Sequence, residues 1–148
     1  MFIQGKIEDA AAAVISASFA AHNVTNWQIN KGLDTHVNTF PSVKVICHNF
    51  EPAYKELNIG TGRAHLEIVT CGIKAIGDAG QGTAATEFET VSDLAFNPFL
   101  ANNIATTLAG YATNLQFLLV SDEGLDVSTL TDGWIASQKY EIVCARTS

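Results

Sequence analysis

Charge is scarce in this sequence, and most of it has one sign. Asp, Glu, Lys and Arg together make up 16% of the 148 residues, against about 25% in an average soluble protein. Fifteen acidic residues stand against eight basic ones, which gives a formal net charge of −7. This excess disfavours adhesion to nucleic acid, because a phosphate backbone selects basic surfaces. A lightly charged surface is expected where neighbouring subunits cover it, but an ordinary acidic bacterial protein has the same composition.

Long hydrophobic runs are also missing. A membrane-spanning helix needs roughly 18 apolar residues, and no run here approaches that length; Leu115–Val120, for example, has the length of a strand. Hydrophobic residues nevertheless make up 47% of the chain, which is enough to build a folded core. The alanine-rich start carries Glu8 and Asp9, so we expect a helix there and not a signal peptide. A chain of this length predicts one domain over residues 1–148, without membrane association.

Cysteine is too sparse to form a disulfide framework. The chain has only Cys47, Cys71 and Cys144, an odd number at wide spacing. All three lie in segments with the composition of strands. We therefore expect buried free thiols in a reducing compartment.

The segment CGIKAIGDAGQGTAATEF, from Cys71 to Phe88, has the order strand, glycine loop, helix that is typical of phosphate sites. Gly77 and Gly82 have the separation found in a P-loop, but the lysine that reaches the phosphates is absent. Asp78 also places a negative charge where a phosphate would lie. We therefore interpret residues 77–82 as a flexible connector between a strand and a helix.

Recognisable metal and nucleophile motifs are lacking as well. There is no CxxC, HExxH or GxSxG pattern. Cys47 and His48 are adjacent, so in a strand they point to opposite faces. A zinc site that only folding assembles stays open, and it would draw on the four histidines, His22, His36, His48 and His65. We expect no cofactor, and a structural or binding role in place of an enzymatic one.

Two groups of carboxylates have ordinary structural explanations. Glu87 and Glu89 follow Thr86, and Thr86 with Glu89 fits a capping box at the start of a helix, with Thr83 as an alternative cap one turn earlier. The second group, Asp122, Glu123 and Asp126, lies in the segment Ser121–Gly133, which predicts an acidic loop or an extended arm between two strands. Trp27 and Trp134 are interpreted either as interface anchors or as core residues.

Hydrophobic periodicity predicts the remaining elements. We expect helices over Gly5–Ala21, from Thr86, and from Pro98, and strands over Val24–Ile29, Ser42–Phe50, Arg63–Ile76, Leu115–Val120 and Trp134–Arg146. Gly72 is expected to mark a bulge or bend. The predicted class is α+β, with a mixed, largely antiparallel sheet of about four to five strands. This sheet packs against the N-terminal helix and a central helix pair.

The order and texture of the segments PSVKV, RAHLEIVTCGIKA, VSDLAFNPFLANNI and WIASQKYEIVC resemble the tail-terminator and tail-completion (tail-to-head joining) proteins of tailed bacteriophages. The resemblance implies a homo-hexameric ring that sits on the last ring of the tail tube and stops its growth. It also implies a surface for the neck or head-completion protein, assembly in the host cytoplasm, and a place in the virion tail or neck. It implies no catalytic residue and no cofactor.

The resemblance places candidate subunit or partner contacts in the polar loops and at one tryptophan. These candidates are Trp27, Asp34, His36, Asp78, Gln81, Asp122, Glu123 and Asp126. The acidic balance suits a ring through which DNA slides without specific binding, because like charges repel. The alternatives are another small phage neck component, such as a head-tail connector or minor tail protein, or a small cytoplasmic enzyme or binding module.

Overall fold

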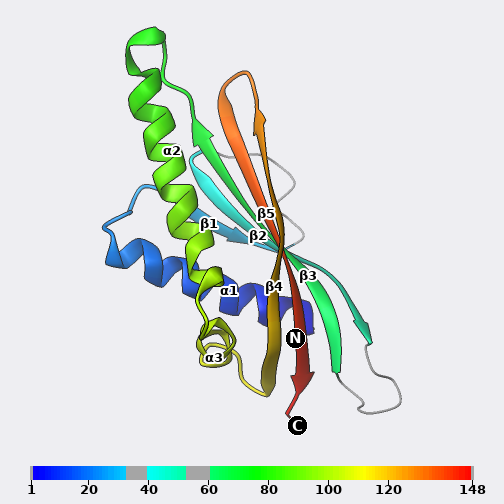
Figure 1. Ribbon diagram of the computed structural model, residues 1–148. Coiled ribbons are helices and arrows are strands. Elements are labelled where there is room, and N and C mark those ends of the chain that lie inside the picture. The colour runs from blue at the N-terminus through cyan, green and yellow to red at the C-terminus, as the bar shows by residue number, and fades with distance from the viewer. Residues whose placement is uncertain (1, 33–39, 53–60, 148) are drawn as a thin grey trace.

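The computed structural model describes residues 2–32, 40–52 and 61–147 and shows an α+β fold (Figure 1). In chain order the elements are α1 (Ile3–Ala21), β1 (Gln28–Lys31), β2 (Ser42–Pro52), β3 (Thr61–Ile73), the 3₁₀ turn η1 (Asp78–Gly80), α2 (Gln81–Phe96), the 3₁₀ turn η2 (Asn97–Leu100), α3 (Ile104–Ala109), β4 (Leu115–Thr129) and β5 (Gly133–Arg146). The predicted N-terminal helix and central helix pair are confirmed.

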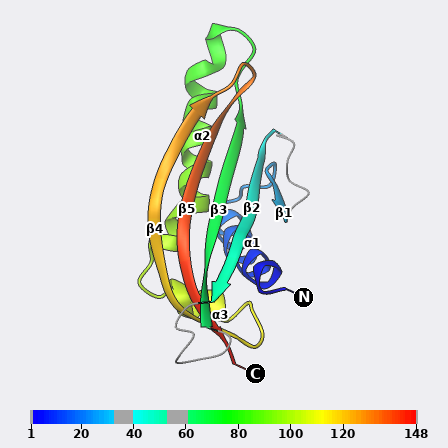
Figure 2. The same ribbon diagram turned by 90° about the vertical axis from the view of Figure 1, so that its right-hand side faces the viewer.

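The five strands form one sheet in the order β1-β2-β3-β5-β4 (Figure 2). β1 runs parallel to β2, and the other neighbours pair antiparallel. The prediction of a mixed, largely antiparallel sheet is therefore confirmed. β4 and β5 make a long hairpin, and β4 forms one border of the sheet.

The helices cover one face of this sheet. α1 packs against β2, α2 against β3 and α3 against β4 (Figure 1). Alternate residues of β3 point toward them, since side chains alternate between the faces of a strand. Ala64, Leu66 and Ile68 are fully buried in this way and meet Ile7 and Ile15 of α1 in one core.

The opposite face of the sheet has no helix over it within the described part of the chain (Figure 2). Arg63, His65 and Glu67, at the other alternate positions in the middle of β3, lie on this open face and are partly or fully exposed. Their neighbours on β2 and β5 continue the same polar surface. The sheet is thus apolar toward the helices and polar along the middle of its open side.

The acidic loop expected over Ser121–Gly133 is wrong for most of its length. β4 continues to Thr129 and pairs with β5 throughout, and its register shifts twice, between Phe117 and Leu119 and between Asp122 and Gly124. The alternative of an extended arm is closer to the structure. The acidic composition led to the prediction of a loop, but a border strand tolerates charged side chains at its exposed positions.

The capping box at Thr86 is also wrong, because α2 begins five residues earlier, at Gln81. The Thr86 hydroxyl donates to the carbonyl of Gly82 at 2.9 Å, one helical turn back. The loop expected over residues 77–82 instead contains η1 and the first turn of α2. The Gln81 amide closes this connection by donating to the carbonyls of Ala75 at 2.6 Å and Gly77 at 3.2 Å.

Gly72 does not mark a bulge. The register between β3 and β5 is unbroken, and Gly72 pairs with Trp134. A Cβ at this position would lie 2.5 Å from Cδ1 of Phe88, a residue of α2 that stacks on Trp134 at a centroid distance of 5.8 Å. The glycine is therefore required for the close approach of α2 to the sheet.

Candidate functional site

The open face of the sheet carries a cluster of titratable side chains from four neighbouring strands. We call it the open-face cluster. Pairing puts His48 of β2 opposite His65 of β3, and His65 in turn opposite Glu141 of β5. Because directly paired residues share a face and have Cβ atoms about 5 Å apart, these groups are close neighbours. The full cluster is His48, His65, Glu67, Glu123, Ser137 and Glu141.

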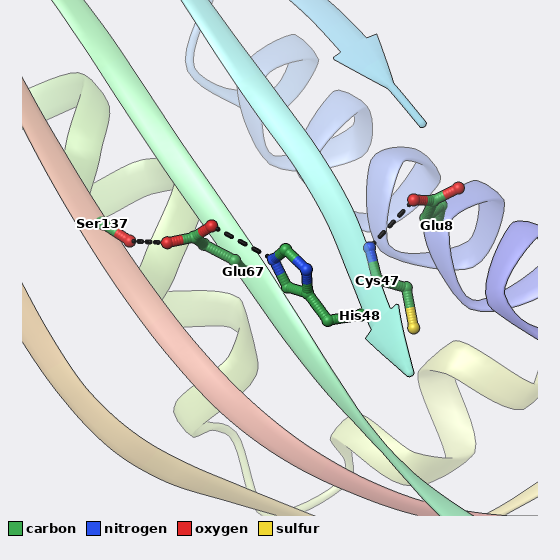
Figure 3. A network of polar contacts seen from close by, with 5 residues as sticks. All are labelled: Glu8, Cys47, His48, Glu67 and Ser137. Atoms are coloured by element: carbon green, nitrogen blue, oxygen red, sulfur yellow. Dashed lines mark hydrogen bonds and ion pairs between the residues drawn. The ribbon is translucent and has the colours of Figure 1, made fainter. Parts of the chain in front are cut away.

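Glu67 is the best-anchored carboxylate of the open-face cluster (Figure 3). The Ser137 hydroxyl donates to its Oε2 at 2.7 Å, and the His48 Nε2 lies 3.3 Å from its Oε1. Burial by itself raises the pKa of Glu67. The hydrogen bonds from Ser137 and His48, with the charges of His48 and Lys139, outweigh burial and hold the Glu67 pKa below its ordinary value.

His65, Glu123 and Glu141 form the second part of the open-face cluster. The His65 Nδ1 lies 2.8 Å from the Glu123 Oε1, and the two side chains form an ion pair when the imidazole is protonated. One ligand atom from each of the three residues lies within 4.8 Å of the other two. The set joins one imidazole nitrogen to two carboxylates, a combination suited to binding a cation or exchanging a proton.

A bulge in β4 places Glu123 on the open face. Asp122 pairs with Tyr140, whereas the next paired residue of β4 is Gly124, so Glu123 is the additional residue of the bulge. The Asp122 carboxylate accepts the N–H of Gly124 at 2.7 Å and the side-chain amide of Gln138. Gly124 has φ +121°, a conformation that favours glycine. Asp122 therefore fixes the backbone that presents Glu123 to His65.

A second candidate surface is the outer border of the sheet. β4 is 15 residues long and exposes four large apolar side chains, each between 49% and 58% accessible: Leu118, Leu119, Leu125 and Val127. We call these four residues the apolar edge. Leu125 and Val127 also line a hollow of about 290 Å³ between α2 and the β4–β5 hairpin. A long, exposed, apolar border strand is a template for association with another chain.

The predicted contact residues fall into different places. Trp27 is buried at 7% exposure, and its Nε1 donates to the Glu87 carboxylate at 3.4 Å, which agrees with the core interpretation. Gln81 binds the backbone before α2. Asp34 and His36 lie outside the described residues, and of Asp78 the structure describes only the backbone, in η1.

The three acidic candidates all lie on β4. Asp122 makes internal hydrogen bonds, Glu123 belongs to the open-face cluster, and Asp126 pairs with Ser137. The structure therefore unites Glu123 with His65 and Glu141, which the sequence did not select. Strand register, which is not visible in sequence spacing, is what brings them together.

The expected buried free thiols are confirmed. Cys47, Cys71 and Cys144 are all free and buried. Burial raises the pKa of Cys47, and with the charge of Glu8, whose Oε2 accepts the N–H of Cys47 at 2.9 Å, the value reaches about 12 (Figure 3). Burial also raises the pKa of Cys144 to about 11 and raises that of Cys71. Such thiols have little thiolate character and react poorly.

A hollow of about 610 Å³ lies between the segment after α1 and the outer side of α2. Its lining is mostly asparagine and threonine, and Glu87 is the one titratable side chain among the described lining residues. One carboxylate without a second titratable group does not make an acid–base pair. The open-face cluster and the apolar edge are therefore the two surfaces to which function is best assigned.

In comparisons with known proteins, no family model and no curated protein matches this chain. None of the helices that the structure describes has both the length and the apolar character needed to cross a membrane.

Proposed function

We propose that this chain is a structural, non-enzymatic subunit of a ring at the head-proximal end of a phage tail tube. There the ring stops tube polymerisation and joins the tail to the neck or head. The order of elements, which resembles that of the tail-terminator and tail-completion proteins, supports the choice of family. The apolar edge supports the assembly, and it is the single observation on which the proposal depends.

The apolar edge is difficult to reconcile with a monomer. Natural border strands are blunted by short length, charged side chains, proline, bulges or a covering segment, and β4 has two bulges and three acidic residues. β4 nevertheless runs for 15 residues and leaves the four side chains of the apolar edge about half exposed. Leu125 and Val127 pair with Gln138 and Ala136 and so share one face of the sheet. Burying a whole Leu or Val side chain contributes about 1.5–3 kcal/mol, so covering the exposed halves of these two contributes about as much as one whole side chain. A second copy of this chain is the occupant that a ring supplies.

The charge of the chain fits this role. A net charge of −7 makes the inner wall of a ring repel DNA, so that the genome passes without specific binding. In this arrangement Asp122, Glu123 and Asp126 of β4 face the lumen or a ring neighbour. The tail tube protein and the neck or head-completion protein are the proposed partners. The proposed location is the virion tail or neck, after assembly in the host cytoplasm.

The first test is the mass of the purified full-length chain in solution, measured by light scattering after size exclusion. The proposal expects a ring-sized oligomer at micromolar concentration. The variant Leu125→Glu removes a half-exposed leucine and puts a charge in the contact. Because each 1.4 kcal/mol is tenfold in affinity, we expect at least about tenfold weaker association.

Ile76→Glu is the matched control. Ile76 is fully exposed and lies between β3 and η1, away from the apolar edge. The same substitution there tests whether added charge alone weakens association. An oligomer that Leu125→Glu leaves intact, or that Ile76→Glu weakens equally, would contradict assembly through the apolar edge. A stable monomer at all concentrations would contradict the ring itself.

A further inference from the structure

We propose that His65, Glu123 and Glu141 form a binding site for a divalent transition-metal ion of the Zn²⁺ type on the open face of the sheet. The proposal is independent of the ring. It depends only on three side chains that β3, β4 and β5 bring together, and the sequence has no metal motif at these positions.

The geometry is close to that of a coordinated ion. The three candidate ligand atoms lie within 4.8 Å of one another. Zn²⁺ binds histidine nitrogen and carboxylate oxygen at about 2.0–2.2 Å, which places two ligands of a tetrahedral site about 3.4 Å apart. Side-chain movements of about 1 Å therefore close the set around an ion, without a change in backbone.

The backbone beneath the three residues is well fixed. His65 and Glu141 are paired across an unbroken stretch of the β3–β5 ladder. Glu123 is held by the bulge that Asp122 stabilises through the N–H of Gly124. Ligands on strands in fixed register lose less conformational freedom on binding than ligands on loops do.

The charge of the site also favours a dication. Glu123 and Glu141 carry two negative charges when ionised, and one divalent ion neutralises both. His65 is the one partner that the described residues offer to Glu123, and no lysine or arginine among them forms an ion pair with Glu141. A bound ion replaces the contact between His65 and Glu123 with two stronger contacts, one from the ion to each of these side chains.

The donor chemistry selects among metals. An imidazole nitrogen favours zinc, nickel and copper, whereas magnesium and calcium prefer oxygen ligands alone. Three protein ligands leave a fourth tetrahedral position for water. His48, directly opposite His65, keeps its Nε2 3.3 Å from Glu67, so it is a neighbour of the site and not one of its ligands.

Isothermal titration of the full-length protein with ZnCl₂ tests this inference. We expect one site of micromolar affinity for Zn²⁺ and much weaker binding of Mg²⁺. His65→Ala and Glu141→Gln should each weaken Zn²⁺ binding by at least about tenfold. Glu141→Gln keeps the size of the side chain, and thermal unfolding of both variants verifies that they fold.

His22→Ala is the matched control. His22 is an exposed histidine at the end of α1, outside the open-face cluster. Its loss should leave Zn²⁺ binding unchanged. The proposal is overturned if the wild-type chain does not bind Zn²⁺ at millimolar concentration, or if His65→Ala and Glu141→Gln bind as tightly as wild type. It is equally overturned if His22→Ala weakens Zn²⁺ binding as much as His65→Ala and Glu141→Gln do.

Discussion

The packing of α2 on the sheet includes one buried polar contact whose value can be measured. Thr70 of β3 and Ser92 of α2 are 0% and 6% exposed, and their hydroxyl oxygens lie 2.6 Å apart. Each hydroxyl is the partner of the other in the core. Thr70→Val and Ser92→Ala, alone and together, therefore test how this contact joins the helix to the sheet.

Each single substitution leaves one buried hydroxyl without its partner, which costs about 1–3 kcal/mol. In Thr70→Val a methyl group also meets the Ser92 oxygen at a distance suited only to a hydrogen bond. The double variant removes both polar groups, and such a replacement is close to neutral. We expect its destabilisation to be at least about 1 kcal/mol smaller than the sum of the two singles.

Urea unfolding, followed by circular dichroism, provides the four free energies of the cycle. At a chain length near 150 residues, 1 kcal/mol also corresponds to about 3 °C in the melting temperature. Thr106→Val, at an exposed position of α3, is the control and should have little effect. Additive single effects would refute the reasoning, because the two hydroxyls would then not be partners.

Three further predictions concern the open-face cluster, the helix–sheet contact and the thiols. Ser137→Ala should destabilise the protein by about 1 kcal/mol near pH 7, after allowance for partial exposure. The effect should fade as pH falls, because a lowered Glu67 pKa stabilises the fold only where the unfolded carboxyl is ionised. Gly72→Ala should cost about 1–3 kcal/mol by displacing Phe88, whereas Gly82→Ala, in open space within α2, should be neutral or stabilising. A thiol-specific disulfide reagent should find no reactive cysteine in the native protein and three after unfolding.

Distinct outcomes would contradict these three predictions. For Ser137→Ala it is a destabilisation that stays the same as pH falls below the pKa of Glu67 in the folded protein, since the protonated carboxyl has lost the charge that the hydroxyl stabilises. For the glycines it is an equal decrease in the free energy of unfolding in Gly72→Ala and Gly82→Ala. For the thiols it is rapid reaction of any cysteine under native conditions.

Much of the fold is predictable from the sequence because its signals are local. β3 shows the alternation directly, with Ala64 and Leu66 each between two polar residues. α1 shows a helical period of buried residues. The far half of β4 alternates too, with Leu125 and Val127 between polar residues, but acidic and threonine-rich composition is typical of loops and concealed it.

The candidate sites were less predictable because they are non-local. His65 and Glu141 are 76 positions apart and meet only through the β3–β5 register. Glu123 was selected as a partner contact, but its relation to His65 depends on a one-residue bulge that composition does not reveal. The burial of Trp27 could not be predicted either, because tryptophan is common both in cores and at interfaces.

The most direct test of the proposed function is electron microscopy of phage tail tubes, grown from the tube protein that the proposal names as a partner, with and without this chain. The account predicts shorter tubes in its presence, each with a ring at one end. The Leu125→Glu variant should leave tubes long and without a ring. Tubes of unchanged length and bare ends in the presence of the wild-type protein would contradict the central claim.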